Sequence, residues 1–167
     1  MMQKPADWIK VAHDDLRMTE LAIGEDIFGM ACFHAQQAAE KTLKGFLIVN
    51  NVNYPQKHDL IRLNRLCRQI DSNFVELKSQ VTLLNQFYMP SRYPDAAVGM
   101  TPEGMPTKET ARKALDFARE VVEFCSEKIK QVEEAKQQAE QKKTDQQQKV
   151  YYKPKNTVQE KDREPER

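Results

Sequence analysis

A run of small and apolar residues at helical spacing is the feature that most constrains how this chain folds. Between residues 28 and 46 such side chains recur every three or four positions: Phe28, Ala31, Ala35, Ala39, Thr42 and Phe46. This period places them on one face of a helix that runs to about Val49. The alanines allow a neighbouring helix to approach closely, at the short end of interaxial distances of roughly 8–10 Å.

Four further stripes of this kind predict four more helices. They cover residues 5–24, 60–70, 74–88 and 107–135. No segment shows the period-two alternation of apolar and polar residues that a half-buried strand requires. The fold class is therefore all-α, and the mostly short connections favour a five-helix antiparallel up-and-down bundle.

Residues with capping side chains mark where three of these helices begin. Asp26 is placed to cap the second helix, and Thr107 is placed to cap the last one. Asn73 and Glu76 resemble a capping box at the start of the fourth helix, although Ser or Thr is its usual first member.

Composition bounds the domain organisation and the kind of partner. A chain of 167 residues with 40% hydrophobic content supplies one core and a tail. We expect a helical-bundle domain over residues 1–135 and a polar Gln-, Lys- and Glu-rich tail, disordered or helical, over residues 136–167. The net charge of +1 provides no whole-protein field that attracts nucleic acid, so any anion site must be local.

Cysteine and histidine spacing argues against disulfides and metal centres. Cys32, Cys67 and Cys125 lie among apolar residues, and their odd number predicts reduced thiols. The close Cys and His spacing of a zinc site is missing, so we expect no metal and no cofactor. The sequence also has no signal-type N-terminus and no run of about 20 apolar residues, which predicts a soluble, cytoplasmic protein without a membrane partner.

Two remote segments carry the residues with binding chemistry. A period of about 3.6 residues brings four polar residues to one side of the second helix: His34, Gln37, Lys41 and Lys44. Residues 88–95, Tyr-Met-Pro-Ser-Arg-Tyr-Pro-Asp, place Arg92 and Tyr93 in a proline-bounded turn. If the two segments meet, they form a cleft with cationic, hydrogen-bonding and aromatic groups, which suits a nucleotide or an RNA phosphate.

Three segments in this order resemble the HEPN domain family, the higher-eukaryote and prokaryote nucleotide-binding domain. They are Phe-His-Ala-Gln-Gln-Ala-Ala-Glu-Lys-Thr-Leu-Lys at 33–44, Lys-His-Asp-Leu at 57–60 and Ser-Arg-Tyr-Pro-Asp at 91–95. The resemblance covers roughly residues 5–132, and the combination is more specific than any one segment. It implies a helical bundle that forms a homodimer, binds nucleotide or RNA in a groove near the dimer interface, and acts beside a minimal nucleotidyltransferase.

The resemblance also bears on catalysis. The catalytic branch of the family is a metal-independent RNase whose signature is an Arg with a His about four to six positions later. That histidine is missing after Arg92, where Ala96, Ala97 and Val98 stand instead. The resemblance therefore implies a binding module without catalysis of its own.

Residue roles follow from the resemblance. In the binding module, Arg92 with Lys41 or Lys44 contacts phosphate, while sugar or base is contacted by three further residues: His34, Gln37 and Tyr93. The alternative is an endoribonuclease of a toxin–antitoxin pair, in which Arg92 supplies the cation and His34 or His58 transfers the proton.

The same residues also have ordinary structural explanations. Arg92 could pair with Asp95 in an exposed contact worth about 0.2–1 kcal/mol. Tyr88 and Tyr93 could pack at an edge of the core. His34 could be a packed ring with a single hydrogen bond, and His58 could end the loop before the third helix. Lys41 and Lys44 could pair with Glu40 or solvent.

Overall fold

The computed structural model describes residues 4–54, 56–88 and 105–151, with side chains up to residue 147. The chain divides into two compact units, residues 1–133 and 134–167. All regular structure in the described ranges is helical, which confirms the all-α class and the five helices. They are α1 (Pro5–Gly24), α2 (Phe28–Val49), α3 (Leu60–Ile70), α4 (Lys78–Leu84) and α5 (Lys108–Tyr151). The predicted division into a bundle and a tail at residue 135 stays a prediction.

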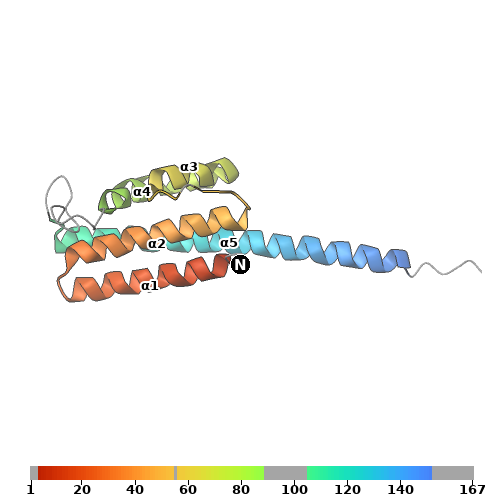
Figure 1. Cartoon of the computed structure of the whole chain (residues 1–167), viewed down its shortest axis with the longest axis horizontal. Helices are drawn as coiled ribbons and strands as arrows, with labels where there is room; N and C mark the ends of the chain where they lie inside the picture. The colour runs from red at the N-terminus through yellow and green to blue at the C-terminus, as the bar shows by residue number, and fades with distance from the viewer. Residues whose placement is uncertain (1–3, 55, 89–104, 152–167) are drawn as a thin grey trace, which may run out of the picture. The chain divides into compact units, whose positions relative to one another are not determined.

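Helices α1 and α2 lie side by side and antiparallel, joined by a tight turn (Figure 1). In this turn the N–H of Ile27 donates to the carbonyl of Ala22 at 2.8 Å, and Asp26 has a left-handed φ of 55°. The N-cap of α2 is Ile27, which makes no side-chain cap. The prediction that Asp26 caps α2 is therefore wrong, because the turn directs its carboxylate to Lys108, whose ammonium donates to it at 3.1 Å.

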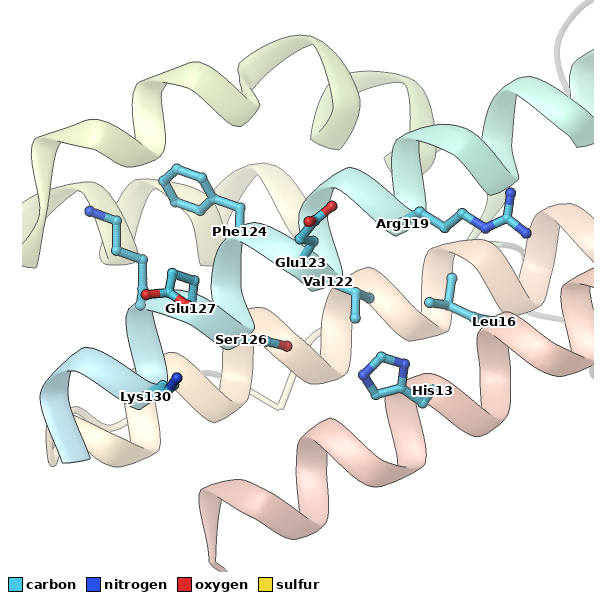
Figure 2. A pocket seen from close by; sticks show the side chains of 10 residues that line it. His13, Leu16, Arg119, Val122, Glu123, Phe124, Ser126, Glu127 and Lys130 are labelled. Atoms are coloured by element: carbon cyan, nitrogen blue, oxygen red, sulfur yellow. The ribbon is translucent and has the colours of Figure 1, made fainter. Parts of the chain in front are cut away.

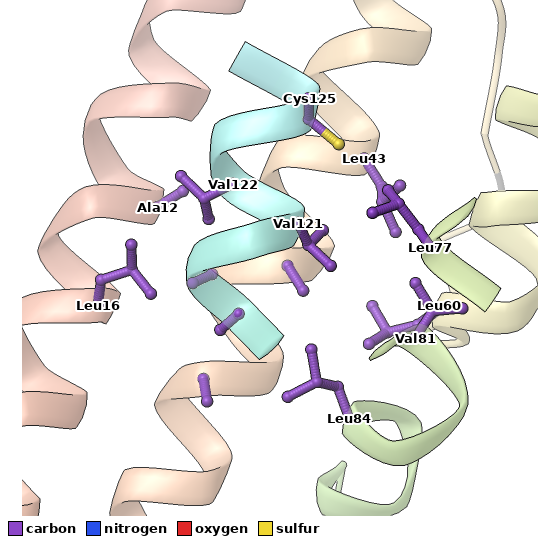
Figure 3. Close-up of a cluster of buried hydrophobic side chains, with 14 of the residues drawn as sticks. Ala12, Leu16, Leu43, Leu60, Leu77, Val81, Leu84, Val121, Val122 and Cys125 are labelled. Atoms are coloured by element: carbon purple, nitrogen blue, oxygen red, sulfur yellow. The ribbon is translucent and has the colours of Figure 1, made fainter. Parts of the chain in front are cut away.

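The small-residue stripe of α2 is buried, as the sequence predicts for a face that other helices approach closely. Ala31, Ala35 and Ala39 are fully buried. Gly45 continues this close approach, because a Cβ at that position would lie 3.3 Å from both Trp8 and Ile129. Larger apolar side chains from the neighbouring helices pack around α2, as Figure 3 shows for Leu16, Leu60, Leu84, Val121 and Val122.

The segment between α3 and residue 88 is less regular than the predicted single helix. It consists of a 3₁₀ helix, Ser72–Leu77, then α4, then a second 3₁₀ turn, Asn85–Phe87. The first of these is capped by Asp71, whose carboxylate accepts from the N–H of Asn73 at 2.9 Å. The predicted capping box of Asn73 and Glu76 is therefore wrong. The predicted apolar face is nevertheless buried: Phe74, Leu77, Val81 and Leu84.

Helix α5 begins as the sequence predicts. The hydroxyl of Thr107 accepts from the N–H of Thr110 at 3.2 Å and so caps the helix. Buried alanines, Val122 and Cys125 face the core of the first unit. The helix continues to Tyr151. Over residues 134–147 its side chains are exposed, and most are Gln, Lys, Glu and Ala, residues with high intrinsic helix propensity. Among the helices in the described ranges, none is long and apolar enough to cross a membrane.

Candidate functional site

The polar residues of α2 reach two different carboxylates, one on α1 and one on α2 itself. The first group, here called the α1–α2 clamp, consists of Asp15, His34 and Lys41. The second, here called the Glu40 cluster, consists of Gln36, Glu40, Lys44, His58 and Tyr88. Both groups include residues that the sequence singled out. The sequence did not point to Asp15, and it indicated Glu40 only as a possible partner of Lys41 and Lys44.

In the α1–α2 clamp a nearly buried carboxylate receives one donor on each oxygen. Oδ1 of Asp15 lies 2.9 Å from Nδ1 of His34, and Oδ2 pairs with Nζ of Lys41. The side chains of His34 and Lys41 are 18% and 24% exposed. They meet the same carboxylate because a spacing of seven residues returns to the same side of a helix.

Glu40 is the centre of the second group, with a side chain that is only 4% exposed. Its Oε1 accepts from Nζ of Lys44 at 2.7 Å, and its Oε2 accepts from the amide of Gln36 at 3.1 Å. Nδ1 of His58 lies 3.0 and 3.1 Å from the two oxygens. An ionised carboxylate only accepts hydrogen bonds, so the proton is on Nδ1 of His58.

The ammonium of Lys44 is enclosed between Glu40 and an aromatic ring. It lies 5.3 Å from the centroid of the Tyr54 ring, and its side chain is 8% exposed. Trp8 meets the Tyr54 ring edge-on, with centroids 6.2 Å apart. Burial, with a smaller contribution from the charge of Glu40, raises the pKa of Tyr54. The phenol therefore stays neutral beside the ion pair.

On the other side of Glu40, the imidazole of His58 stacks on Tyr88. The ring centroids are 4.3 Å apart and the planes differ by 17°. The His58 side chain is 40% exposed, and Tyr88 is half-buried. Nearby, the side-chain oxygen of Asn85 accepts from the N–H of Leu60 at 2.8 Å. This bond joins the two segments that carry the rings.

The structure therefore separates the four residues that the sequence placed on one side of α2. His34 and Lys41 share Asp15, whereas Lys44 pairs with Glu40 and Gln37 donates to Gln36 at 2.7 Å. Pairing with Glu40 was the ordinary structural explanation for Lys44. Arg92 and Tyr93 lie outside the described residues, so their meeting with α2 stays a prediction.

Two sequence signals point to these carboxylates as centres of polar groups. Asp15 stands beside the apolar face of α1, next to Leu16 and four residues before buried Thr19. Glu40 precedes Lys44 by four residues, which is the favoured order for a helical ion pair. His58 was recognised, but its partner was not, because Glu40 lies 18 positions away.

Thiol and metal chemistry find no support in the described residues. No group of three or more His, Cys, Asp or Glu side chains in those ranges could hold a metal ion. The three cysteines are free and buried. Burial raises the pKa of Cys32 and of Cys125 to about 12, and it also raises that of Cys67. Thiols of this kind stay protonated at neutral pH and are poor nucleophiles.

A hollow of about 800 Å³ lies between α1 and the part of α5 in the first unit (Figure 2). His13 and Leu16 line it from α1, and Val122 and Arg119 line it from α5. Arg119 already donates to Glu20 at 2.7 Å. None of the predicted site residues that the structure describes lines this hollow. We therefore place the candidate site at the Glu40 cluster, where polar and aromatic groups from three segments converge.

Comparisons with solved structures agree with this architecture. An archaeal HEPN homologue is 28% identical, with a TM-score of 0.61 over 77% of this chain and 99% of that chain. A protein of Thermus thermophilus is also 28% identical, with a TM-score of 0.60 over 74% of this chain and 97% of that one. A HEPN domain protein of Thermotoga maritima, 21% identical, shares the fold with a TM-score of 0.54 over 72% and 95%.

The sequence itself was compared with protein families and with curated proteins. No curated protein matches the chain. The HEPN domain family matches residues 5–142, which includes α1 to α4 and most of α5. On this match, the chain belongs to the HEPN domain family.

Proposed function

We propose that this protein is a nucleotide- or RNA-binding module that acts with a minimal nucleotidyltransferase and has no catalytic activity of its own. The observation that carries the proposal is the convergence of the Glu40 cluster, which gathers a carboxylate, an ammonium, an imidazole and a phenol. Membership of the HEPN domain family supports the same ligand class. Hydrogen-bonding groups beside aromatic rings are the chemistry with which proteins recognise unpaired nucleotides.

Arg92 is the proposed phosphate contact. It follows Tyr88 by four residues, so the covalent chain keeps its Cα within roughly 14 Å of that of Tyr88. A guanidinium fits phosphate in a bidentate manner. Lys41 is the better second cation, because its side chain is 24% exposed whereas that of Lys44 is 8% exposed. His34, Gln37 and Tyr93 stay the proposed contacts to sugar or base.

Calorimetric titration tests this assignment. The wild-type protein is titrated with a nucleoside triphosphate and with a short single-stranded RNA, and both titrations are repeated with Arg92→Ala. We expect the substitution to weaken binding because it removes a charge-assisted contact to phosphate. Arg65→Ala, which removes an exposed arginine from α3, is the matched control for charge. Equal affinities for wild type and Arg92→Ala would remove Arg92 from the site.

The proposed partners are a second copy of the chain and the nucleotidyltransferase. Exposed apolar side chains follow one side of α1, namely Val11, Met18 and Leu21, and such a stripe favours a protein contact. We expect light scattering to give the mass of a dimer for wild type and the mass of a monomer for Met18→Glu.

Co-expression with a nucleotidyltransferase encoded by a neighbouring reading frame should give one complex on gel filtration, and separate elution would contradict this partnership.

One observation favours a second candidate function, that of a metal-independent endoribonuclease. Glu40 fixes the proton on Nδ1 of His58, as a carboxylate does when it orients a histidine base. In this alternative Nε2 of His58 takes the proton of the 2′-hydroxyl, and the 2′-oxygen bonds to phosphorus. Arg92 stabilises the charged phosphorane, the bond from phosphorus to the 5′-oxygen then breaks, and the leaving oxygen takes a proton from water. Expression that arrests growth, with relief by either Arg92→Ala or His58→Gln, would favour the nuclease. Harmless expression would favour the binding module.

A further inference from the structure

We propose that the stacked rings of His58 and Tyr88 form a platform for an unpaired nucleobase. This inference rests on the proposed function, because it names the part of the ligand that the Glu40 cluster receives. The base could belong to single-stranded RNA or to a free nucleotide, and the two share the flat aromatic surface that the platform would contact.

The geometry of the two rings fits this role. Their centroids are 4.3 Å apart and their planes differ by only 17°, so they form a nearly parallel stack. The His58 side chain is 40% exposed, which leaves part of the stack accessible. A base lies on such a surface with little preference for its identity, because every base has an aromatic face.

The surroundings hold the platform in place before a ligand arrives. Glu40 accepts from the ring of His58, and its own position is fixed by Lys44 and Gln36. The side-chain oxygen of Asn85 accepts from the N–H of Leu60, and this bond joins the start of α3 to the 3₁₀ turn before Tyr88. Rings held by such contacts lose little conformational freedom on binding, so the contact costs less entropy.

Charge favours a base over a phosphate at this position. Among the described residues, Lys44 is the lysine that contacts Glu40. That carboxylate balances its charge, and the Tyr54 ring lies against its ammonium. For Lys44 to contact a phosphate, its buried ion pair would have to break, which is strongly unfavourable. The exposed part of the cluster is therefore aromatic and hydrogen-bonding, as a nucleobase requires.

Fluorescence anisotropy with labelled RNA tests the platform. The probes are a single-stranded oligonucleotide and a duplex of the same sequence, with a mononucleotide as competitor. Tyr88→Leu should weaken binding of the single strand by roughly 5- to 150-fold, the range expected for one lost stack. Tyr88→Phe keeps a ring and should bind like wild type. Phe117→Leu, which removes a half-buried ring of α5 outside the Glu40 cluster, is the matched control.

A second measurement uses the wild-type protein and does not depend on the folding of a variant. A fluorescent base analogue in the single strand should lose emission on binding, because stacking on aromatic rings quenches it. Competition by the mononucleotide at similar concentration would identify a free nucleotide as the ligand, and weak competition would identify single-stranded RNA.

The outcomes separate this inference from the proposed function. If wild type binds and folded Tyr88→Leu binds equally well, the platform is wrong and the binding module remains. Unchanged emission of the base analogue in the bound complex would also overturn the platform. If wild type binds neither probe nor the mononucleotide, the proposed function fails, and the platform fails with it.

Discussion

The α1–α2 clamp and the Glu40 cluster are built from the same parts and differ in what they connect. Each places a carboxylate between a lysine of α2 and a histidine. In the clamp all three residues belong to α1 and α2, which are neighbours in sequence and in space. In the Glu40 cluster the histidine comes from the segment before α3 and stacks on a tyrosine after α4.

This difference gives the two histidines unequal access to a ligand. His34 in the clamp is 18% exposed, so its ring offers a ligand less surface. His58 in the cluster is 40% exposed, although its carboxylate partner is almost fully buried. A buried anchor with an exposed ring is the arrangement that presents a side chain to a ligand in a fixed orientation.

The largest expected effect is the loss of stability on removing Glu40. Glu40→Ala leaves Lys44 with a buried and unpaired charge, which costs about 3–5 kcal/mol. Each kcal/mol lost lowers the midpoint temperature of thermal unfolding by roughly 2–4 °C, so this midpoint should fall by on the order of 10 °C. A scan by circular dichroism measures this. The double variant Glu40→Leu with Lys44→Met should recover much of the loss, because it leaves no uncompensated charge.

Removal of Asp15 should cost less. Asp15→Ala deletes hydrogen bonds from two nitrogen donors, and we expect a loss of about 1.5–3 kcal/mol. The loss is smaller than for Glu40 because Lys41, at 24% exposure, can reach water. Urea titration measures it. A greater loss for Asp15→Ala than for Glu40→Ala would reverse the comparison and make the clamp the more strongly coupled network.

The smallest effect should come from an ion pair that belongs to neither group. Nζ of Lys128 lies 2.6 Å from Asp71, and the hydrogen bond from Lys128 lowers the pKa of that carboxyl below its usual value. A depressed pKa in the folded state stabilises the protein above about pH 4, and this stability is lost as the pH falls through the folded-state pKa. Asp71→Asn should therefore cost less than about 1 kcal/mol at pH 7 and almost nothing near pH 2.

The free energy of unfolding of wild type and of Asp71→Asn, measured at both of these pH values, checks this prediction. Asp116→Asn is a suitable control, because that carboxylate is 69% exposed and lies 3.7 Å from Arg119. If Asp71→Asn loses as much stability as Asp15→Ala, then the exposure of a carboxylate does not determine how much stability its replacement costs.

Much of the fold could be predicted because helix periodicity is a local property. The stripe from Ala31 to Phe46 identified the buried face of α2, and the hydroxyl of Thr107 identified the start of α5. Capping was less predictable where several acidic or amide residues stand together. Asp71 rather than Asn73 caps the 3₁₀ helix, because the turn after α3 brings the aspartate to the free N–H groups.

The candidate site was only partly visible from the sequence. His34, Lys41 and Lys44 were recognised as one polar side of α2, yet they serve two carboxylates. Asp15 lies 26 positions from Lys41, and no local pattern states which residue of α1 faces it. Pairings of this length depend on how the helices are rotated and offset against one another.

The sequence by itself determined that the chain is helical, which faces of the helices are apolar, and that its segments resemble the HEPN domain family. Its spacing carries this information because each helical face is set by residues three and four positions apart. Only the tertiary structure decided that Glu40, rather than a surface of lysines, organises the candidate site. The physical reason is that a buried carboxylate must pair with donors that lie next to it, and packing between distant segments places those donors there.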